Sequence, residues 1–178
     1  MNIDWEISPI DDITAEAFFA LINKNREHIR KTFPGTLSGC DSFEKTQEFI
    51  AAANEKQAKR EGHYFYIHHK EMETLIGYIC VKNIDPRILR CELAYFIDED
   101  FEGQGIITKA VSNTIAYCFN ELLMNKIIIC TSKENTASQR IATKHGFVKE
   151  GLLRKEFRSG EGSLEDICYF GLLKSDYK

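Results

Sequence analysis

The sequence lacks any apolar run that approaches the ~20 residues needed to cross a bilayer. Its first six residues, MNIDWE, are acidic and interrupted, which is not the pattern of a secretory signal. We therefore expect a cytoplasmic protein with no membrane partner. The chain also lacks repeats, linkers and low-complexity tracts. Its 178 residues are enough to bury one core, so we expect a single domain spanning residues 1–178.

Paired cysteines are missing as well. No two of the six cysteines are closer than 11 residues, so the sequence has no Cys-x-x-Cys metal or redox pair, and the five histidines are equally scattered. We expect buried, reduced thiols and no metal site. The formal net charge of −4 argues weakly against direct nucleic-acid binding, which usually requires a dominant basic surface. That charge suits a cationic substrate, but it is also common among cytoplasmic proteins.

Hydrophobic spacing predicts an α+β fold. One helix is expected from Thr14 to about Phe33, ended by Pro34-Gly35. A second should begin near Asp41, which has capping-box spacing to Glu44, and end near residue 62. Three aromatic and β-branched strands follow as an antiparallel meander, and two further helices and three further strands complete the chain. These elements are expected at residues 63–69, 75–82 and 89–97 (strands), 104–122 (helix), 127–130 (strand), 135–145 (helix), and 147–154 and 164–173 (strands).

The most informative stretch runs from Ala94 to Thr108. A strand enters a turn with the pattern Gly103-x-Gly105, and the turn opens a long amphipathic helix. Glycines let backbone N–H groups turn inward, and the helix start adds a partial positive charge, which together suit a diphosphate. The alternative is an ordinary tight turn that requires positive φ. The Gly-x-Gly-x-x-Gly fingerprint fails because Thr108 stands at its third glycine.

Two further features carry polar side chains at unusual places. Asn135 and Gly146 are suited to begin and end a three-turn helix, which leaves Ser138 within that helix unassigned. Glu92 lies on an otherwise apolar strand, on the same face as Ala94 and Phe96. A solvated sheet face would also explain one isolated carboxylate.

The order of these elements resembles the GNAT superfamily of acetyl-CoA-dependent N-acetyltransferases over essentially the whole chain. More narrowly, the chain resembles the ribosomal-protein N-terminal acetyltransferases of the RimJ/RimL type. Three features carry that narrower likeness, which also extends to residues 23–33 on the acceptor side. They are Asn135-x-x-Ser138-x-Arg140, then Lys144-x-Gly146-Phe147-x-x-Glu150-Gly151, then Asp166 with Tyr169 and Leu172-Leu173.

The resemblance implies a mixed, mostly antiparallel sheet of six to seven strands, about four flanking helices and a splayed pair of central strands. It implies acetyl-CoA as the acyl donor and direct transfer without an acetyl-enzyme. The residues expected at the cofactor are Phe96 and Ile97 at pantetheine, then Gly103, Gln104, Gly105, Ile106, Ile107 and Thr108 at the pyrophosphate, with Asn135 and Ser138 near the thioester. The usual phosphate motif, Arg/Gln-x-x-Gly-x-Gly/Ala, is altered here, because Glu102 and Ile107 replace its first and last residues.

The acceptor is expected to be a primary amine. An α-amine has a pKa near 7.7–8.0, so about one in ten is neutral at pH 7, whereas a lysine with a pKa near 10.4 is almost fully charged. A protein N-terminus is therefore the easier acceptor. Glu92 is the expected base, and Ser138 is the expected group at the departing thiolate.

Two alternatives stay open: a small-molecule amine as the acceptor, such as a polyamine, an amino acid or an aminoglycoside, or a non-catalytic module. The acceptor wall is expected to include His28, Arg30 and Phe33, with Tyr64 or Tyr66 nearby. The resemblance also implies that a homodimer is common in such proteins.

Overall fold

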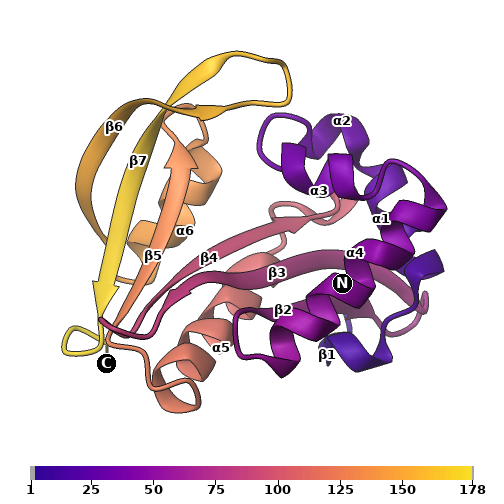
Figure 1. Cartoon of the computed structure of the whole chain (residues 1–178), viewed down its shortest axis with the longest axis horizontal. Helices are drawn as coiled ribbons and strands as arrows, with labels where there is room; N and C mark the ends of the chain where they lie inside the picture. Colours follow the sequence, from indigo (N-terminus) through magenta and orange to yellow (C-terminus); the bar gives the residue numbers. More distant parts are fainter. Residues whose placement is uncertain (1–2, 178) are drawn as a thin grey trace.

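The computed structural model describes residues 3–177 and has a seven-stranded mixed sheet at its centre (Figure 1). The strand order is β1-β2-β3-β4-β5-β7-β6, and only the β4–β5 pair is parallel. The expected α+β class with a mostly antiparallel sheet is confirmed. The strands are β1 (Trp5–Pro9), β2 (His63–His69), β3 (Thr74–Asp85), β4 (Arg90–Ile97), β5 (Lys126–Ser132), β6 (Val148–Arg158) and β7 (Leu164–Leu173).

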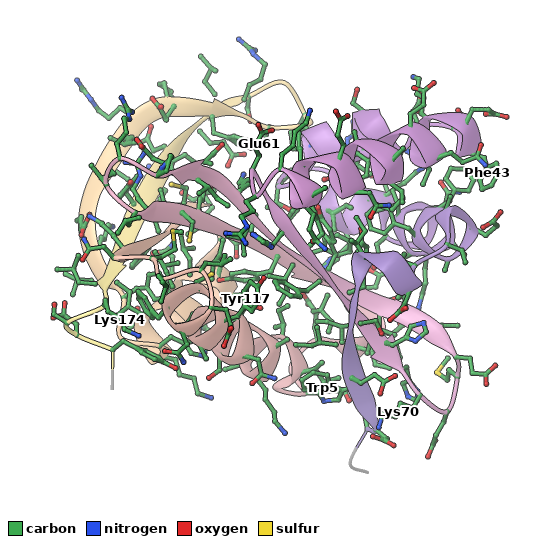
Figure 2. The ribbon with its side chains drawn as sticks, turned by 60° about the horizontal axis from the view of Figure 1, so that its bottom comes forward. Trp5, Phe43, Glu61, Lys70, Tyr117 and Lys174 are labelled. Atoms are coloured by element: carbon green, nitrogen blue, oxygen red, sulfur yellow. The ribbon has the colours of Figure 1, made fainter. Side chains whose placement is uncertain are left out.

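The helices cover both faces of this sheet (Figure 1). The first four α-helices lie on one face, and the last two lie on the other. In Figure 2, Tyr117 and Trp5 lie on the α5 side, while Phe43 lies among the N-terminal helices. The helices are α1 (Ala15–Lys24), α2 (Arg26–Ile29), α3 (Pro34–Gly39), α4 (Phe43–Ala58), α5 (Ile106–Asn120) and α6 (Thr136–Lys144), with short 3-10 turns η1 (Ile10–Asp12) and η2 (Glu99–Phe101).

Strand alternation divides the buried side chains into two cores. Alternate residues of a strand point to opposite faces, so Tyr78 faces α1 and α4, whereas Ile79 faces α5. The core on the N-terminal side is rich in aromatic rings, with Phe18, Tyr66 and Tyr78 in mutual contact. The core on the other side is mainly aliphatic. Both faces of the sheet are therefore covered, as in an α+β layered protein.

The single helix expected over residues 14–33 is wrong. It breaks at Asn25, whose side chain makes one local and one tertiary hydrogen bond. Its Nδ2 donates to the carbonyl of Leu21 over 3.0 Å, and its Oδ1 accepts the N–H of Glu99 over 3.1 Å. Asn25 is fully buried, so these bonds are stronger determinants than helix propensity. Pro34 does not terminate the region but opens α3, a position that suits its fixed φ.

Two other boundaries differ from the expectation. The start of α4 is capped by Ser42 rather than Asp41, because the Ser42 Oγ accepts the N–H of Lys45 over 3.3 Å. Asp41 instead lies 3.3 Å from the Lys45 ammonium. The edge strand β1 was not predicted, since its five residues contain only Trp5 and Ile7 as an alternating apolar pair. Its pairing with β2 supplies the stability that so short a pattern lacks.

Within residues 3–177, no helix is both long enough and apolar enough to cross a membrane.

Candidate active site

The centre of the sheet is split between its two parallel strands. Residues 90–92 of β4 pair with residues 126–128 of β5, and along the described strands this pairing stops after Glu92. Beyond that point β4 stays paired to β3, and β5 stays paired to β7, so the two halves of the sheet diverge (Figure 1). The facing edges of β4 and β5 therefore present backbone groups that another extended molecule can satisfy. The predicted splayed pair is confirmed.

The Gly103–Gly105 turn lies where β4 leads into α5. Gly103 has φ of 72° and Gly105 has φ of 77°, which is the left-handed region that favours glycine. A Cβ at either position would meet nothing within 4 Å, so backbone conformation rather than space requires these glycines. Gly105 caps α5 without a side-chain hydrogen bond in the described part of the chain. The first amides of α5 are therefore free to bind an anion at the positive end of a 15-residue helix.

The residues around this turn have distinct environments. Ile106 is buried and anchors the helix, whereas Ile107 and Thr108 are half-buried. The Gln104 side chain turns back and donates to the carbonyl of Asp100 over 3.2 Å. Only the backbone of Gln104 is thus oriented for a ligand.

Phe96 and Ile97, at the end of β4, are buried on opposite faces of the sheet. The Phe96 ring packs against Phe33, with ring centroids 5.3 Å apart. Because both side chains belong to the cores, only their backbone groups can reach the gap between the strands.

Asn135, Ser138 and Tyr95 connect β4 to α6 across the split. The Asn135 Oδ1 accepts the N–H of Ser138 over 3.0 Å, which confirms Asn135 as the N-cap. The hydroxyls of Ser138 and Tyr95 are 3.2 Å apart. Burial raises the pKa of Tyr95 to about 12, although its hydrogen bond to Ser138 lowers it somewhat. Tyr95 was missed by sequence reasoning, because its spacing to Ser138 gives no signal before the fold is known.

Glu92 lies at the closed end of the split and is 12% exposed. It is flanked by two donors: the Lys82 ammonium is 3.2 Å from one carboxylate oxygen, and the Asn83 amide donates to the other over 2.8 Å. Burial lowers the pKa of Lys82, but the nearby charge of Glu92 raises it by more. The pKa of Lys82 therefore lies above its usual value. Cys130 of β5 lies near the same Glu92 and Lys82 charges. Burial raises the pKa of Cys130 to about 11, so it is held as a thiol.

The acceptor wall expected from the sequence is assembled only in part. Phe33 lies against β4, but the His28 ring lies 3.4 Å from the Glu102 carboxylate, beside the Gly103–Gly105 turn. Tyr64 and Tyr66 are buried within the aromatic core, so they do not line an open surface. Burial also raises the pKa of Tyr66.

The tip of the β6–β7 hairpin spans the split on the side of α2 (Figure 1). Gly160 packs so closely on the carbonyl of Arg30 that a side chain at Gly160 would collide with it. Next to this contact, Lys31 and Glu161 form an ion pair over 3.4 Å. Sequence reasoning gave no role to residues 159–163 beyond a turn. In the fold they contact residues 30 and 31 at the end of α2.

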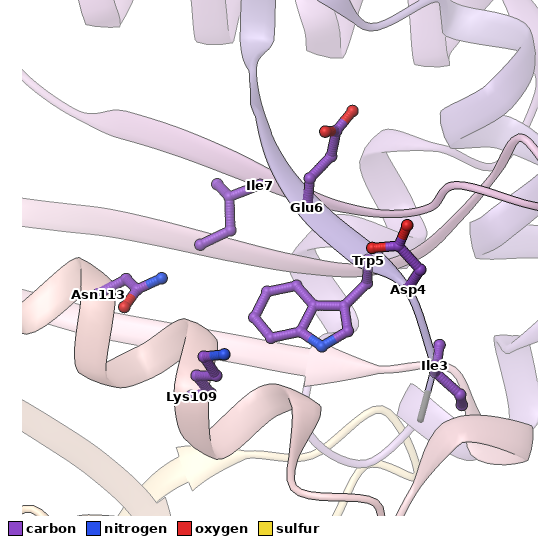
Figure 3. Close-up of a pocket in the computed structure, with 7 residues that line it drawn as sticks. All are labelled: Ile3, Asp4, Trp5, Glu6, Ile7, Lys109 and Asn113. Carbon is purple, nitrogen blue, oxygen red and sulfur yellow. The ribbon is translucent and has the colours of Figure 1, made fainter. Parts of the chain in front are cut away.

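Two hollows lie away from the split. One, of about 320 Å³, lies between β1 and α5 and is lined by Trp5, Lys109, Asn113 and neighbours (Figure 3). The other, of about 660 Å³, is an open surface along α6 beside Arg140 and Lys144. Among the described residues, no group of three or more His, Cys, Asp or Glu could hold a metal ion. The chemistry-bearing residues gather at the split instead.

Comparison with known proteins decides the family. The model of the acetyltransferase (GNAT) domain matches residues 6–148, which is most of the chain. The chain belongs to the GNAT acetyltransferase family. As in other GNAT acetyltransferases, the acyl donor is acetyl-CoA. The predicted enzyme class, fold and donor are thus confirmed.

Individual relatives of this GNAT acetyltransferase have several names. It is 35% identical over 105 residues to YdaF of Bacillus subtilis (strain 168), provisionally named a ribosomal N-acetyltransferase, and the match covers 59% of the chain and 57% of YdaF. The ribosomal-protein-S5-alanine acetyltransferase from Vibrio fischeri has the same fold, with a TM-score of 0.88, 22% identity, and coverage of 100% of this chain and 96% of that one. The spermidine N-acetyltransferase from Vibrio cholerae, solved with CoA and spermine, gives a TM-score of 0.80 and 22% identity, with 97% of each chain covered.

Proposed function

We propose that this GNAT acetyltransferase transfers an acetyl group to the N-terminal α-amine of a protein, of the ribosomal-protein type. Residues 1–178 would act as one domain in the cytoplasm, where both acetyl-CoA and new protein N-termini are found. The similar proteins include some that are named for ribosomal or ribosomal-protein substrates and others that are named for spermidine.

The charge of the acceptor side is the observation that carries the proposal. Residues 26–31 contain Arg26, His28, Arg30 and Lys31, and the last three lie against the carboxylates of Glu102, Glu27 and Glu161. This segment meets the tip of the β6–β7 hairpin at the edge of the split. A polyamine with several positive charges would find the carboxylates of this lip already paired with His28, Arg30 and Lys31. A protein N-terminus carries one positive charge, and the acidic residues that follow it in some proteins would be attracted.

The environment of Glu92 also favours an α-amine over a polyamine as the acceptor. Both of its carboxylate oxygens already have donors, Lys82 and Asn83. A carboxylate is a weak base. An α-amine, which is already partly neutral at pH 7, requires only such a base, whereas a lysine or a polyamine amine requires a stronger one. We infer that Glu92 receives the amine proton, directly or through one water molecule.

The residues at the split fit acetyl-CoA. The turn with Gly103 and Gly105 and the uncapped start of α5 suit its pyrophosphate, which the backbone amides of residues 103–108 would bind. The unpaired edge of β4 at Phe96 and Ile97 suits the pantetheine amides, and Asn135 would contact the same arm. Bound acetyl-CoA supplies the acetyl group as an activated thioester.

Ser138 would stabilise the departing sulfur on the α6 side of the sheet. Its hydroxyl can donate a proton there while the Tyr95 hydroxyl donates to the Ser138 Oγ. Because Tyr95 keeps its proton well above neutral pH, this hydrogen bond persists over the working range. Glu92 and Ser138 thus serve opposite ends of the reaction, from opposite faces of the sheet.

An acceptor panel tests this proposal. Purified protein is mixed with acetyl-CoA and a thiol reagent, and with ribosomal-protein N-terminal peptides, the same peptides with blocked α-amines but free lysines, or spermidine. We expect turnover with free α-amines only. Glu92→Gln should lower kcat at least tenfold, consistent with a general base. Turnover with spermidine or blocked peptides alone would contradict the acceptor assignment and favour the small-amine reading.

We also infer that the protein forms a homodimer through β6 and β7. Several large apolar side chains are exposed on these two strands, and a second copy of the chain could cover them. They are Val148, Leu152, Leu153, Leu164 and Leu173. Light scattering after size-exclusion chromatography should give twice the chain mass of 20.5 kDa, and a single-chain mass would contradict the dimer.

A further inference from the structure

The segment after α1 is fastened to the turn that precedes the cofactor loop. The Lys24 ammonium lies 2.8 Å from the Asp98 carboxylate and 2.6 Å from that of Asp100. Asn25 accepts the N–H of Glu99 over 3.1 Å. Asn25 and Asp98 are 0% and 2% exposed, so they belong to the packed interior, whereas Lys24 and Asp100 lie at its surface. The position of α2 relative to the loop at residues 102–108 is therefore fixed by buried groups.

One turn beyond this contact, the His28 ring reaches Glu102. The His28 Nε2 is 3.4 Å from the Glu102 Oε1, and the two side chains are 24% and 55% exposed. Glu102 directly precedes Gly103, the first glycine of the turn. A residue expected on the acceptor wall thus lies against the cofactor loop.

Glu102 is the least suitable residue of that loop for an anion. A carboxylate next to the amides of residues 103–108 would repel a diphosphate bound there. The position carries a basic or amide residue in the motif that this sequence departs from. Something must therefore offset the charge of Glu102 or hold its side chain away from the ligand.

We propose that His28 is a positioning residue for the pyrophosphate of CoA. It holds the Glu102 carboxylate against α2 and away from the ligand, so that the backbone amides of the loop face the diphosphate without a competing anion. This inference rests on the proposed cofactor site. It assigns to His28 a function at the donor side rather than at the acceptor.

A double-mutant cycle measured by calorimetry tests the inference. His28→Ala should weaken the binding of CoA about three- to fivefold, as expected for the loss of a partly exposed polar contact. In the Glu102→Gln background, where no carboxylate remains to be held, the same change at His28 should alter the affinity less than about 1.5-fold, since uncoupled changes are near neutral. His28→Lys, whose ammonium can hold the same carboxylate, should bind CoA within twofold of the wild type.

Pantetheine and an unrelated charge change provide the controls. Pantetheine lacks the pyrophosphate, so its affinity should be the same in the wild type and in His28→Ala. Lys45→Ala removes one positive charge from α4, far from the loop, and should leave CoA affinity unchanged. Unfolding curves confirm that each variant is folded.

The possible failures are distinguishable. An equal loss of CoA affinity in the wild-type and Glu102→Gln backgrounds would overturn the inference, because His28 would then act without Glu102. A matching loss of pantetheine affinity would also overturn it by showing a general structural defect. If the wild-type protein bound no CoA at all, the proposed cofactor site itself would be wrong.

Discussion

Gly105 combines two functions in one residue, because it both begins α5 and turns the amides of the loop toward an anion. Its φ of 77° lies in the left-handed region, where a Cβ is penalised even though nothing nearby would collide with it. Gly105→Ala should therefore lower the free energy of unfolding by about 1 kcal/mol and weaken CoA binding. Urea denaturation and calorimetry measure the two effects.

Gly151 provides a matched control for that substitution. It also has open space around its Cβ position, but it lacks a positive φ. Gly151→Ala should stay within about 0.5 kcal/mol of the wild type and bind CoA normally. If the two alanine variants behaved alike, the conformational role of Gly105 would be disproved.

Tyr95 makes the stability of the fold decrease as the pH rises through the alkaline range. Burial raises its pKa to about 12, above the value near 10 of an unfolded chain. The folded state thus holds the phenolic proton to higher pH than the unfolded state does. The stabilisation is complete below about pH 10 and is lost as the pH rises toward 12.

Tyr95→Phe should accordingly show a smaller loss of stability between pH 9 and pH 11 than the wild type. Denaturant unfolding at several pH values measures this difference. Other buried tyrosines, such as Tyr66 and Tyr78, titrate in both proteins, so the difference reports on Tyr95 alone. Identical pH profiles would show that the Tyr95 phenol is not buried as described.

At the scale of elements, the sequence predicted those structures whose signals are local. The strand β2, the turn at Gly103 and Gly105, and the N-cap at Asn135 follow from aromatic and β-branched content, glycine and capping chemistry that neighbouring residues determine. Residues 14–33 look helical throughout because their spacing is helical. The break at Asn25 depends on Glu99, which is 74 residues away, and no local pattern contains that contact.

The candidate site divides in the same way. The cofactor loop could be predicted from two glycines that lie two residues apart in the sequence. The pairs Tyr95–Ser138 and His28–Glu102 could not, because each joins two elements only after the sheet has formed. Lys82 and Asn83 beside Glu92 were missed for that reason too, and they occupy both of its carboxylate oxygens.

The β6–β7 hairpin is the element that limits access to the split. Its tip has no room for a side chain at Gly160, because the Arg30 carbonyl occupies that space. Gly160→Ala should displace the tip from α2 and raise KM for a peptide acceptor several-fold, while the affinity for CoA stays unchanged. Steady-state kinetics and calorimetry separate these effects.

Gly35 serves as the control for the hairpin prediction. A Cβ at Gly35 would meet nothing within 4 Å, and its φ is not positive. Gly35→Ala should leave KM unchanged. Equal KM values for the wild type and Gly160→Ala would contradict the claim that the hairpin tip bounds the acceptor path.

On the scale of the whole molecule, the protein consists of two sheet halves joined along a short parallel seam. Three residue pairs connect β4 to β5, and the gap beyond them lies in the middle of the fold. A ligand that binds along both strand edges would hold the halves together. CoA at a hundred times its Kd should stabilise the fold by about 2.7 kcal/mol by mass action.

In a thermal scan this stabilisation should raise Tm by about 5–10 °C for a chain of this size. Pantetheine at the same concentration should raise it less, because it lacks the diphosphate that the loop binds. Equal Tm shifts with CoA and with pantetheine would show that residues 103–108 contribute little to binding.

The central claim is that the amides of residues 103–108, at the start of α5, bind the diphosphate of CoA and direct its thioester into the gap between β4 and β5. Titration calorimetry of CoA into the folded wild-type protein tests this claim most directly. The account predicts saturable binding at one site per chain, weakened by Gly105→Ala and unchanged by Gly151→Ala. The absence of binding to folded protein, or equal binding by both variants, would contradict it.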